Sequence, residues 1–256
     1  TETLERKGIT VFYGQRAANI TDDIDCVVFT SAIHKDNPEY IATMEKGIPH
    51  LTRAQLLGEI MQNYKTPIAI SGTHGKTTTT SMVSEILLHA GTDPTLSIGG
   101  MLKSIGGNIR VGNTDLFVTE ACEYTNSFLS FFPRIGMILN IEEDHLDFFK
   151  DIEDIKHSFR LFAERVPAET GTVIANCDDA NTMDALRGIE RKVITFGLSP
   201  KADVYAENIV HRGSSSEFDI YHRGNLFSHV TIHVPGIHNV RNALAATAAA
   251  LSLIHI

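Results

Sequence analysis

The sequence predicts an α/β fold. A partial Rossmann-like N-terminal domain over residues 1–64 precedes a larger domain over residues 65–256, which is built on a parallel sheet with a small antiparallel β subsheet. Short apolar, β-branched runs alternate with segments whose apolar residues recur at helical spacing, as in parallel α/β sheets. A glycine-rich turn near position 72 joins a strand-like run to a helix-like run. Segments after position 200 alternate polar and apolar residues, which is typical of antiparallel strands.

Length and composition bound the class of protein. A chain of 256 residues is long enough for one or two domains with a sizeable core. Its formal net charge of −9 argues against nucleic acid as the main partner, because no basic field would attract a phosphate backbone. No apolar run reaches the length of a membrane span and no signal peptide opens the chain, so we expect no membrane partner.

The cysteines indicate a reducing compartment. Cys26, Cys122 and Cys177 are odd in number and widely spaced, which fits neither a disulfide framework nor a paired-cysteine metal site. We therefore expect a cytoplasmic protein.

The first 64 residues read as the later part of a Rossmann-like domain. The apolar runs Ile9–Tyr13 and Cys26–Thr30 suit buried parallel strands. Pro38–Lys46 reads as a helix with proline in its first turn, and Arg53–Asn63 repeats apolar residues at helical spacing. No G-x-G-x-x-G dinucleotide fingerprint is present in this part of the sequence.

The second domain is organised around the turn Gly72–Thr77. Pro67–Ser71 before it reads as a short buried strand, and Thr77–Ala90 after it reads as a helix. Glycines in such a turn let backbone N–H groups converge on a phosphate, to which the helix N-terminus adds its positive dipole end. Lys76 would reach the β- and γ-phosphates, and the Thr77 hydroxyl would hold Mg²⁺. The turn therefore predicts a nucleoside triphosphate site and a P-loop-type ATPase domain.

The turn departs from the general phosphate-loop pattern at one position, because Ile70 stands where that pattern has a glycine. The alternative interpretation is a strand-to-helix turn, rich in glycine and threonine, that carries an ordinary exposed lysine. We favour the phosphate loop, because the strand and the helix that flank the turn both agree with it.

Two further strands deliver polar residues to the same edge of the predicted sheet. Leu116–Thr119 is followed by Glu120, and Ile135–Leu139 is followed by Asn140 and, a few residues on, by His145. Ligands bind outside the carboxyl ends of the strands in open α/β sheets, so we expect these loops to meet at one site.

Glu120 and His145, together with the Thr77 hydroxyl, are suitable magnesium ligands beside a triphosphate. Each also has a structural interpretation, since Glu120 could be an N-cap or an exposed strand-end acid, and a lone histidine is more often structural. On these residues alone both interpretations stay open.

The remaining segments complete the sheet. Thr172–Asn176 and Lys192–Phe196 add two strands, and the antiparallel subsheet is expected from Val204–His211, Glu217–His222 and Leu226–Val234. An alanine-rich helix follows, for which Asn239 is a competent N-cap.

The two ends of the sequence are unusual. The chain starts without methionine, and Leu251–Ile256 can be read as the translation of a sequencing adaptor. We expect the chain to be a gene fragment whose last six residues are not native.

Four motifs, in order, resemble those of the Mur ligase superfamily, which builds the peptide stem of the bacterial cell wall. They are Gly72–Thr78, Glu120–Leu129, Asn140–Asp147 and Pro235–Asn242, the last of which matches a Gly-x-His-Asn-x-x-Asn pattern. Shorter matches before residue 64 extend the resemblance over nearly the whole chain. The resemblance implies a domain that holds a UDP-linked substrate, followed by a central domain that binds ATP and Mg²⁺.

The resemblance also implies roles for individual residues. The residues expected to bind ATP are Gly72, Thr73, His74, Gly75, Lys76, Thr77, Thr78, His238, Asn239 and Asn242. The residues expected to take part in catalysis are Lys76, Glu120 and His145, and those expected to hold Mg²⁺ are Thr77, Glu120 and His145. The residues expected to contact substrate are Ser31, Arg53, His74 and Asn108.

Several of these positions have ordinary alternatives. Ser31 and Arg53 also suit a turn and a solvated helix start, and Asn108 lies in a glycine-rich section that reads as loops. Cys122 replaces an acidic residue of the family motif, so we expect no ligand role for it. Some branches of the superfamily carry a carbamylated lysine on the next helix. We do not transfer that modification to Lys156.

Within the superfamily, His74 and the threonines after Lys76 most resemble the branch that joins L-alanine to UDP-N-acetylmuramate. The resemblance implies that ATP phosphorylates the lactyl carboxylate and that the amine of L-alanine attacks the acyl phosphate. Two alternatives stay open: the recycling branch that joins a tripeptide to the same nucleotide, and a P-loop nucleotide-binding module without ligase activity. We expect this chain by itself to bind Mg-ATP weakly and to form no amide.

Overall fold

The computed structural model describes residues 2–254. Its internal contacts divide the chain into two compact units, Thr1–Leu57 and Gly58–Ile256. The sequence predicted a boundary between residues 64 and 65, whereas the division falls inside helix α3 (Arg53–Met61).

The later residues of α3 explain this difference. A Cβ atom on Gly58 would lie 2.0 Å from the carbonyl oxygen of Ser130, so the two backbones touch and only glycine leaves room. Met61 is fully buried, and its sulfur accepts a hydrogen bond from the N–H of Phe132 at 3.2 Å. These contacts join residues far apart in the sequence, which the local apolar period does not reveal.

The first unit contains a small sheet of two parallel strands, β1 (Val27–Phe29) and β2 (His50–Thr52). Helix α2 (Pro38–Lys46) has the predicted bounds. The side chain of Asn37 accepts a backbone hydrogen bond at 2.8 Å in its first turn, and Gly47 ends it with φ at 63°. The other elements of this unit before α3 are α1 (Glu2–Arg6) and η1 (Ala17–Asn19).

The strand predicted over Ile9–Tyr13 is wrong. The segment is a loop in which Ile9, Phe12 and Tyr13 are 50%, 61% and 69% exposed. An apolar run becomes a strand only where a neighbouring strand completes its hydrogen bonds and covers its side chains. Among the described residues, the sheet of the first unit contains β1 and β2 alone.

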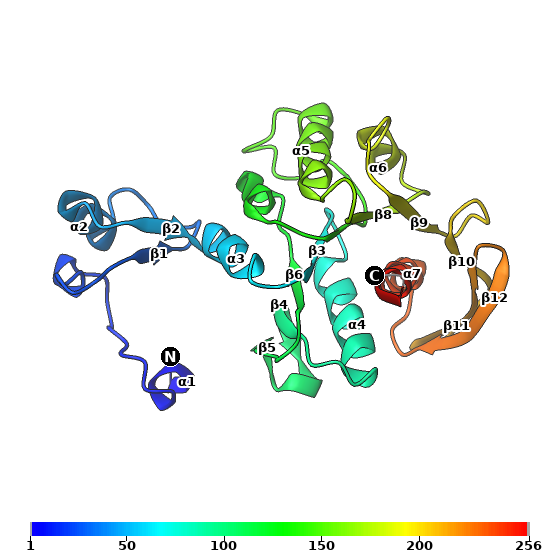
Figure 1. The fold of residues 1–256 in the computed structure, drawn as a ribbon, viewed down its shortest axis with the longest axis horizontal. Helices are drawn as coiled ribbons and strands as arrows, with labels where there is room; N and C mark the ends of the chain where they lie inside the picture. Colours follow the sequence, from blue (N-terminus) through cyan, green and yellow to red (C-terminus); the bar gives the residue numbers. More distant parts are fainter. Residues whose placement is uncertain (1, 255–256) are drawn as a thin grey trace. The chain divides into compact units, whose positions relative to one another are not determined.

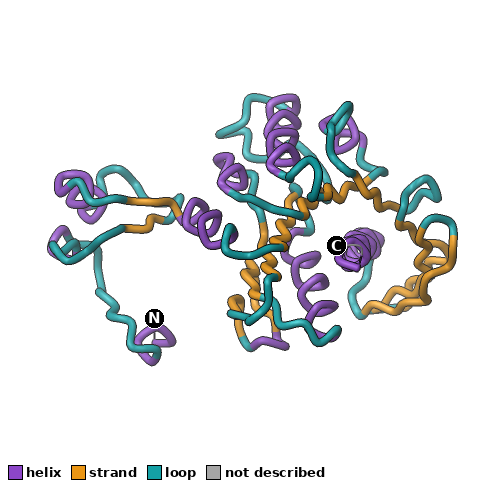
Figure 2. Tube along the Cα trace, viewed as in Figure 1, coloured by secondary structure: helices purple, strands orange, loops and turns teal. Residues whose placement is uncertain are grey.

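The second unit is built on one continuous, curved sheet of ten strands (Figure 2). Their spatial order is β12-β11-β10-β9-β8-β7-β3-β6-β4-β5. Neighbours from β10 to β4 run parallel, and β11, β12 and β5 are antiparallel. The strands are β3 (Thr66–Ser71), β4 (Thr95–Leu102), β5 (Gly107–Arg110), β6 (Leu116–Glu120), β7 (Ile135–Ile138), β8 (Thr172–Asn176), β9 (Val193–Gly197), β10 (Val204–Arg212), β11 (Ser215–His222) and β12 (Asn225–Ile232).

The mixed α/β fold with its antiparallel part confirms the predicted fold class. The antiparallel strands continue the parallel sheet, because β10 pairs with β9 on one side and with β11 on the other. The section after Ser97 differs from the prediction: it forms β4 and β5, where loops were expected.

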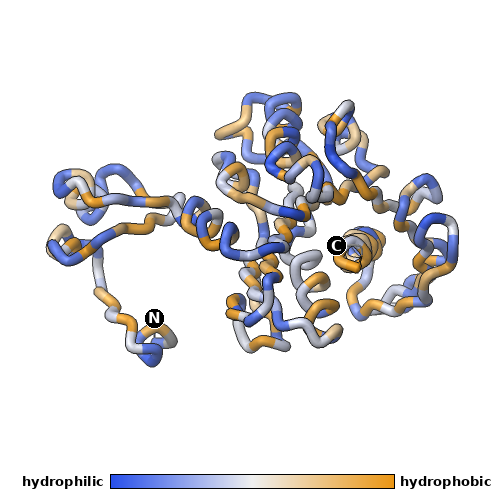
Figure 3. Tube along the Cα trace, viewed as in Figure 1, coloured by the Kyte–Doolittle hydropathy of each residue, from blue (hydrophilic) through white to orange (hydrophobic). Residues whose placement is uncertain are grey.

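Helices cover both faces of this sheet (Figure 1). Helices α4 and α7 pack on each other and on one face, and α5 and α6 lie on the other. Helix α7 is apolar along most of its length (Figure 3), and its buried alanines allow close packing. The helices are α4 (Lys76–His89), α5 (Ile152–Arg165), α6 (Ala180–Ala185), α7 (Ile237–Ile254), and the short η2 (Lys103–Ile105) and η3 (Tyr124–Ser130).

Helix α7 includes most of the tail that the sequence marked as non-native. Leu251 and Ser252 are buried in it, and residues 255–256 lie outside the described residues. No helix within residues 2–254 is both long enough and apolar enough to cross a membrane.

The packing of α5 yields a stability prediction. Phe162 is fully buried and stacks on Phe128 with their ring centroids 4.9 Å apart. Phe162→Ala would leave a cavity in this core and lower the free energy of unfolding of the second unit by about 3–5 kcal/mol. Phe227 is 54% exposed, so Phe227→Ala should change that free energy by less than about 1 kcal/mol. Urea denaturation of both variants measures the difference, and equal losses would contradict it.

Candidate nucleotide and metal site

Strand β3 lies between β6 and β7 in the parallel part of the sheet. The carboxyl ends of the three strands therefore meet at one edge, which confirms the predicted convergence of Ser71, Glu120 and Asn140. Backbone hydrogen bonds link the strand ends, from the N–H of Ala121 to the carbonyl of Ile70 at 2.8 Å and from the N–H of Leu139 to the carbonyl of Ser71 at 3.0 Å.

The turn after β3 is held by Asn140. The N–H of His74 donates to the Asn140 side-chain oxygen at 2.7 Å, and the side-chain nitrogen donates back to the carbonyl of His74 at 3.0 Å. The N–H of Thr73 donates to the backbone carbonyl of Asn140 at 3.1 Å. Gly72 has a φ of 140°, and a Cβ there would lie 2.9 Å from that of Leu139, so both conformation and space require glycine.

Lys76 begins α4 and turns back over the loop. Its Nζ donates to the carbonyls of Gly72 at 2.5 Å and Thr73 at 3.1 Å, and it lies 3.0 and 3.1 Å from the two carboxylate oxygens of Glu123. Glu123 is only 2% exposed. Sequence reasoning did not single out this buried acid, although it lies three residues after Glu120 in the same motif.

Thr77 and Glu120 form a second contact between the loop and the end of β6. The Thr77 hydroxyl donates to Glu120 Oε2 at 3.0 Å, and Glu120 Oε1 accepts from the N–H of Gly99 at 2.5 Å. A Cβ on Gly99 would lie 2.7 Å from the carboxylate, so a side chain there would displace Glu120. Thr77 is exposed and Glu120 is half-buried, and the pair offers a hydroxyl and a carboxylate to a cation.

His145 lies with a different set of acids. Its Nε2 is 3.8 Å from Glu123 Oε1 and its Nδ1 is 3.8 Å from Asp144 Oδ1. One ligand atom from each of Glu123, Asp144 and His145 falls within 4.8 Å of the others. The expected trio of Thr77, Glu120 and His145 is thus divided between two sets of side chains.

The residues present fit a hard divalent cation. Hydroxyl and carboxylate oxygens, with an imidazole nitrogen, are donors that Mg²⁺ accepts beside phosphate oxygens and water. Thr77 and Glu120 would hold one ion, and Glu123, Asp144 and His145 make a second group of suitable donors.

A cavity of about 480 Å³ opens between the loop and the first turn of α7. Its volume is in the range of small-ligand sites. It is lined by His74, Gly75, Leu139, Asn140, Glu142, Asn176, Asp178, Asp179, Phe196, His238, Arg241 and Asn242. Four of the residues expected to bind ATP, from two segments far apart in the sequence, therefore share one cavity.

Asn242 joins the two sides of this cavity. It is 7% exposed, and a Cβ on Gly75 would lie 2.6 Å from its side-chain oxygen, so loop and helix are in direct contact. Asn239 is a residue of the first turn of α7 and not its N-cap, because the helix begins at Ile237. The Asn239 side chain donates to the carbonyl of Pro235 at 2.6 Å and accepts from Asn242 at 3.3 Å.

Other expected site residues lie elsewhere. Thr78 lines an apolar groove between α4, α7 and β12. Asn108 is an exposed residue of β5, the strand at one edge of the sheet. Ser31 and Arg53 are exposed residues of the first unit, in a turn and at the start of α3. Ser31 and Arg53 therefore lie outside the unit that contains the loop and the cavity.

Asp178 and Arg241 are cavity residues that sequence reasoning missed. Arg241 Nε lies 3.7 Å from Asp178 Oδ2, and Nε is buried without a hydrogen-bond partner among the described residues. Asp178 follows β8, so the strand-end rule that selected Glu120 could have found it. Arg241 stands between two motif residues, where nothing in the sequence distinguishes it from a surface arginine.

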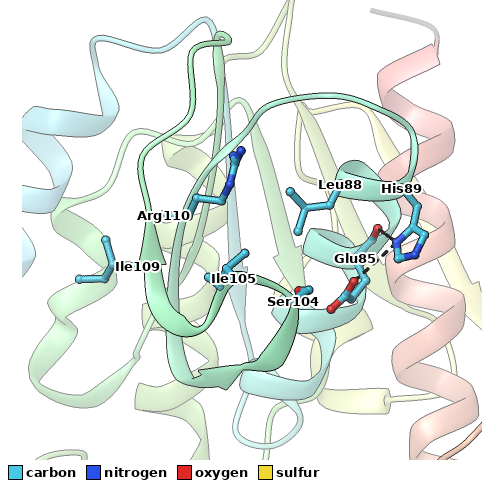
Figure 4. A pocket seen from close by; sticks show the side chains of 7 residues that line it. All are labelled: Glu85, Leu88, His89, Ser104, Ile105, Ile109 and Arg110. Carbon is cyan, nitrogen blue, oxygen red and sulfur yellow. Dashed lines mark hydrogen bonds and ion pairs between the residues drawn. The ribbon is translucent and has the colours of Figure 1, made fainter.

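A second cavity, of about 520 Å³, lies between α4 and the β4–β5 region (Figure 4). Arg110, Ile105 and Leu88 face it. At its rim, His89 Nδ1 lies 2.8 Å from the backbone carbonyl oxygen of Glu85 and 3.5 Å from its carboxylate. It is lined by no residue that was expected to bind ATP, metal or substrate. The 480 Å³ cavity between the Gly72–Thr77 loop and α7 therefore remains the candidate site.

Lys156 is held as an ammonium group. Its Nζ lies 2.7 Å from Asp184 and 2.5 Å from Glu153, and the hydrogen bond to Asp184 raises the pKa of Lys156. Carbamylation needs the neutral amine, so these contacts disfavour the modification that we did not transfer to this residue.

Two family models match the chain. The Mur ligase middle domain matches residues 70–250, and the catalytic domain of the Mur ligase family matches residues 1–65. The chain belongs to the Mur ligase family. The predicted resemblance is therefore confirmed, and the matched ranges meet near the predicted boundary.

Named Mur ligases are similar to the chain over nearly its whole length. UDP-N-acetylmuramate–L-alanine ligases of Agathobacter rectalis and Caldanaerobacter subterraneus are 55% and 49% identical over 99% and 96% of the chain, which covers 55% and 54% of them. The chain thus spans about half the length of the curated relatives that it matches.

Solved structures of Mur ligases show the same fold. The UDP-N-acetylmuramate:L-alanyl-γ-D-glutamyl-meso-diaminopimelate ligase of Neisseria meningitides matches with a TM-score of 0.89 and 29% identity, over 99% of this chain and 82% of that one. The UDP-N-acetylmuramate–alanine ligase of Thermotoga maritima matches with a TM-score of 0.84 and 29% identity, over 99% and 56%.

The site yields a prediction about thiol reactivity. Burial, with the charge of Asp178 next, raises the pKa of Cys177 to about 11. The thiolate is the reactive form, so at pH 8 only about one Cys177 in a thousand is reactive, and alkylation should accelerate as the pH rises toward 11.

Iodoacetamide labelling at pH 8, followed by peptide mass spectrometry, measures this rate. Exposed Cys26 provides the comparison within the same chain. Equal labelling of Cys26 and Cys177 at pH 8 would show that Cys177 is not shielded.

Proposed function

We propose that the chain carries the ATP-binding part of a ligase that joins L-alanine to the lactyl carboxylate of UDP-N-acetylmuramate, in peptidoglycan precursor synthesis. The observation that carries the proposal is the cavity in which His74 and Gly75 of the loop meet His238 and Asn242 of α7. The names of relatives at 46–55% identity support the choice of the two substrates.

In this proposal the triphosphate of ATP lies on the turn Gly72–Thr77, and its nucleoside lies in the cavity beside α7. The turn offers backbone N–H groups at the start of a helix, which favour a polyanion. Thr77 and Glu120 would hold Mg²⁺, which supplies positive charge to the phosphates when bound. A cytoplasmic location, where ATP is available, is part of the proposal.

The chemistry explains why these residue types are needed. A carboxylate and a triphosphate are both anions, so their approach requires neutralising charge. Lys76 provides a fixed ammonium group at the loop, and backbone donors orient the transferred phosphoryl group. The substrate carboxylate takes the γ-phosphoryl group of ATP and ADP leaves. The amine of L-alanine then attacks the acyl phosphate, loses a proton and expels phosphate. His74 is exposed at the cavity and 3.6 Å from Glu142, where it could face the carboxylate of the substrate.

A second candidate is the ligase that joins a tripeptide to the same nucleotide. The TM-score of 0.89 to the Neisseria enzyme favours it, although both solved ligases are 29% identical to this chain. The fold therefore does not separate the two acceptors. The 55% identity to an L-alanine ligase favours L-alanine.

The test is ATP-dependent phosphate release with UDP-N-acetylmuramate and a panel of amino acids and peptides. It is measured on this chain and on any longer protein that contains it. Release with L-alanine supports the proposal, and release only with tripeptide supports the second candidate. The absence of both phosphate release and ATP binding would contradict both.

Lys76→Met tests the loop directly. Loss of the ammonium group should weaken ATP binding at least about tenfold, as measured by titration calorimetry. Lys65→Met is the matched control, because Lys65 is an exposed lysine of the same unit whose Nζ pairs with Asp115 at 2.7 Å. Thermal unfolding is measured alongside, since Lys76→Met leaves Glu123 buried without its cation. Unchanged ATP affinity in Lys76→Met would contradict the assignment.

A further inference from the structure

The ammonium group of Lys76 is fully engaged by the protein itself. An ammonium has three N–H donors, and Lys76 has three partners: the carbonyls of Gly72 and Thr73 and the carboxylate of Glu123. Its side chain is 18% exposed. A phosphate that binds Lys76 must therefore displace at least one of these partners.

Of these three partners, Glu123 would be destabilised most by losing its contact with Lys76. Its side chain is 3% exposed, and both oxygens lie within 3.1 Å of Lys76 Nζ. A buried carboxylate without a counter-charge is strongly destabilising. If a phosphate binds Lys76 in place of Glu123, Glu123 needs another cation to balance its buried charge.

A candidate site for such a cation lies beside Glu123. Nε2 of His145 is 3.8 Å from Glu123 Oε1, and Asp144 completes a group whose ligand atoms lie within 4.8 Å of one another. Two carboxylates and an imidazole can accept a divalent ion. Glu123 is therefore shared between the ammonium of the loop and a candidate cation site.

We propose that Glu123 is a positioning residue with two partners. Before nucleotide binds, it holds Lys76 against the Gly72–Thr77 loop. When a triphosphate binds the Lys76 ammonium, Glu123 pairs instead with a cation held at Asp144 and His145. The inference rests on the proposed function, since it requires that Lys76 bind phosphate. It makes nucleotide and cation binding cooperative, because each ligand removes the competitor of the other.

Titration calorimetry of ATP, with EDTA and with Mg²⁺, tests this on the wild-type chain and on Glu123→Gln. The variant keeps the shape of the side chain and removes its charge. It should bind metal-free ATP about tenfold more tightly, because the competitor for Lys76 is weakened, and Mg²⁺ should then add less affinity than in the wild type. A purely structural role would instead lower both affinities together.

Asp115→Asn is the matched control. Asp115 is an acid of the same unit that does not line the cavity, and its carboxylate, 55% exposed, pairs with Lys65 at 2.7 Å. Its replacement should leave the difference between metal-free and Mg²⁺ titrations unchanged. If Glu123→Gln does not fold, Glu123→Asp, which withdraws the carboxylate by one methylene, should show the same change in smaller degree.

A second measurement does not depend on ATP. Modification of amines by trinitrobenzenesulfonate, followed by peptide mass spectrometry, should label Lys76 faster in Glu123→Gln than in the wild type. Equal labelling, or equal metal-free ATP affinity, would overturn the inference while leaving the proposed function intact. A wild-type chain that binds no ATP would overturn the proposed function and the inference with it.

Discussion

The hydrogen bonds between the side chain of Asn140 and the backbone of His74 determine the geometry of the whole site. They tie the turn after β3 to the turn after β7, so the loop is oriented by a neighbouring strand and not by its own sequence alone. Gly72 makes the contact possible, because a side chain there would collide with Leu139. With the turn held, α4 begins with Lys76 and Thr77 placed toward the end of β6.

Two acids three residues apart then meet two consecutive loop residues. Glu123 contacts Lys76 and Glu120 contacts Thr77, so the loop that is expected to hold phosphate is lined by carboxylates. An acidic site of this kind suits a polyanion only when cations accompany it. Two groups of side chains offer suitable donors for cations, Thr77 with Glu120, and Glu123 with Asp144 and His145. The net charge of the chain is no obstacle, because the relevant charges act within a few ångströms.

Sequence patterns located the elements well where the signal is local. Asn37, Pro38 and Gly47 carry cap and turn chemistry for α2, and its bounds were predicted residue for residue. The strand predicted over Ile9–Tyr13 fails for the opposite reason: its apolar residues have no neighbouring strand, and a strand exists only through its partners. In the section after Ser97, glycines suggested loops, yet β4 and β5 pair with each other and make most of it strand.

By itself, the sequence determined the strand–turn–helix around Gly72–Thr77, most of the later strands and the motifs that show the Mur ligase family. These depend on residue types at short spacing, which local chemistry interprets directly. The tertiary structure decided which side chains share a site. Lys76 meets Glu123 across 47 positions, and Gly75 meets Asn242 from the other end of the unit. Such pairs follow from strand order and register within the sheet, and no local period in the sequence encodes them.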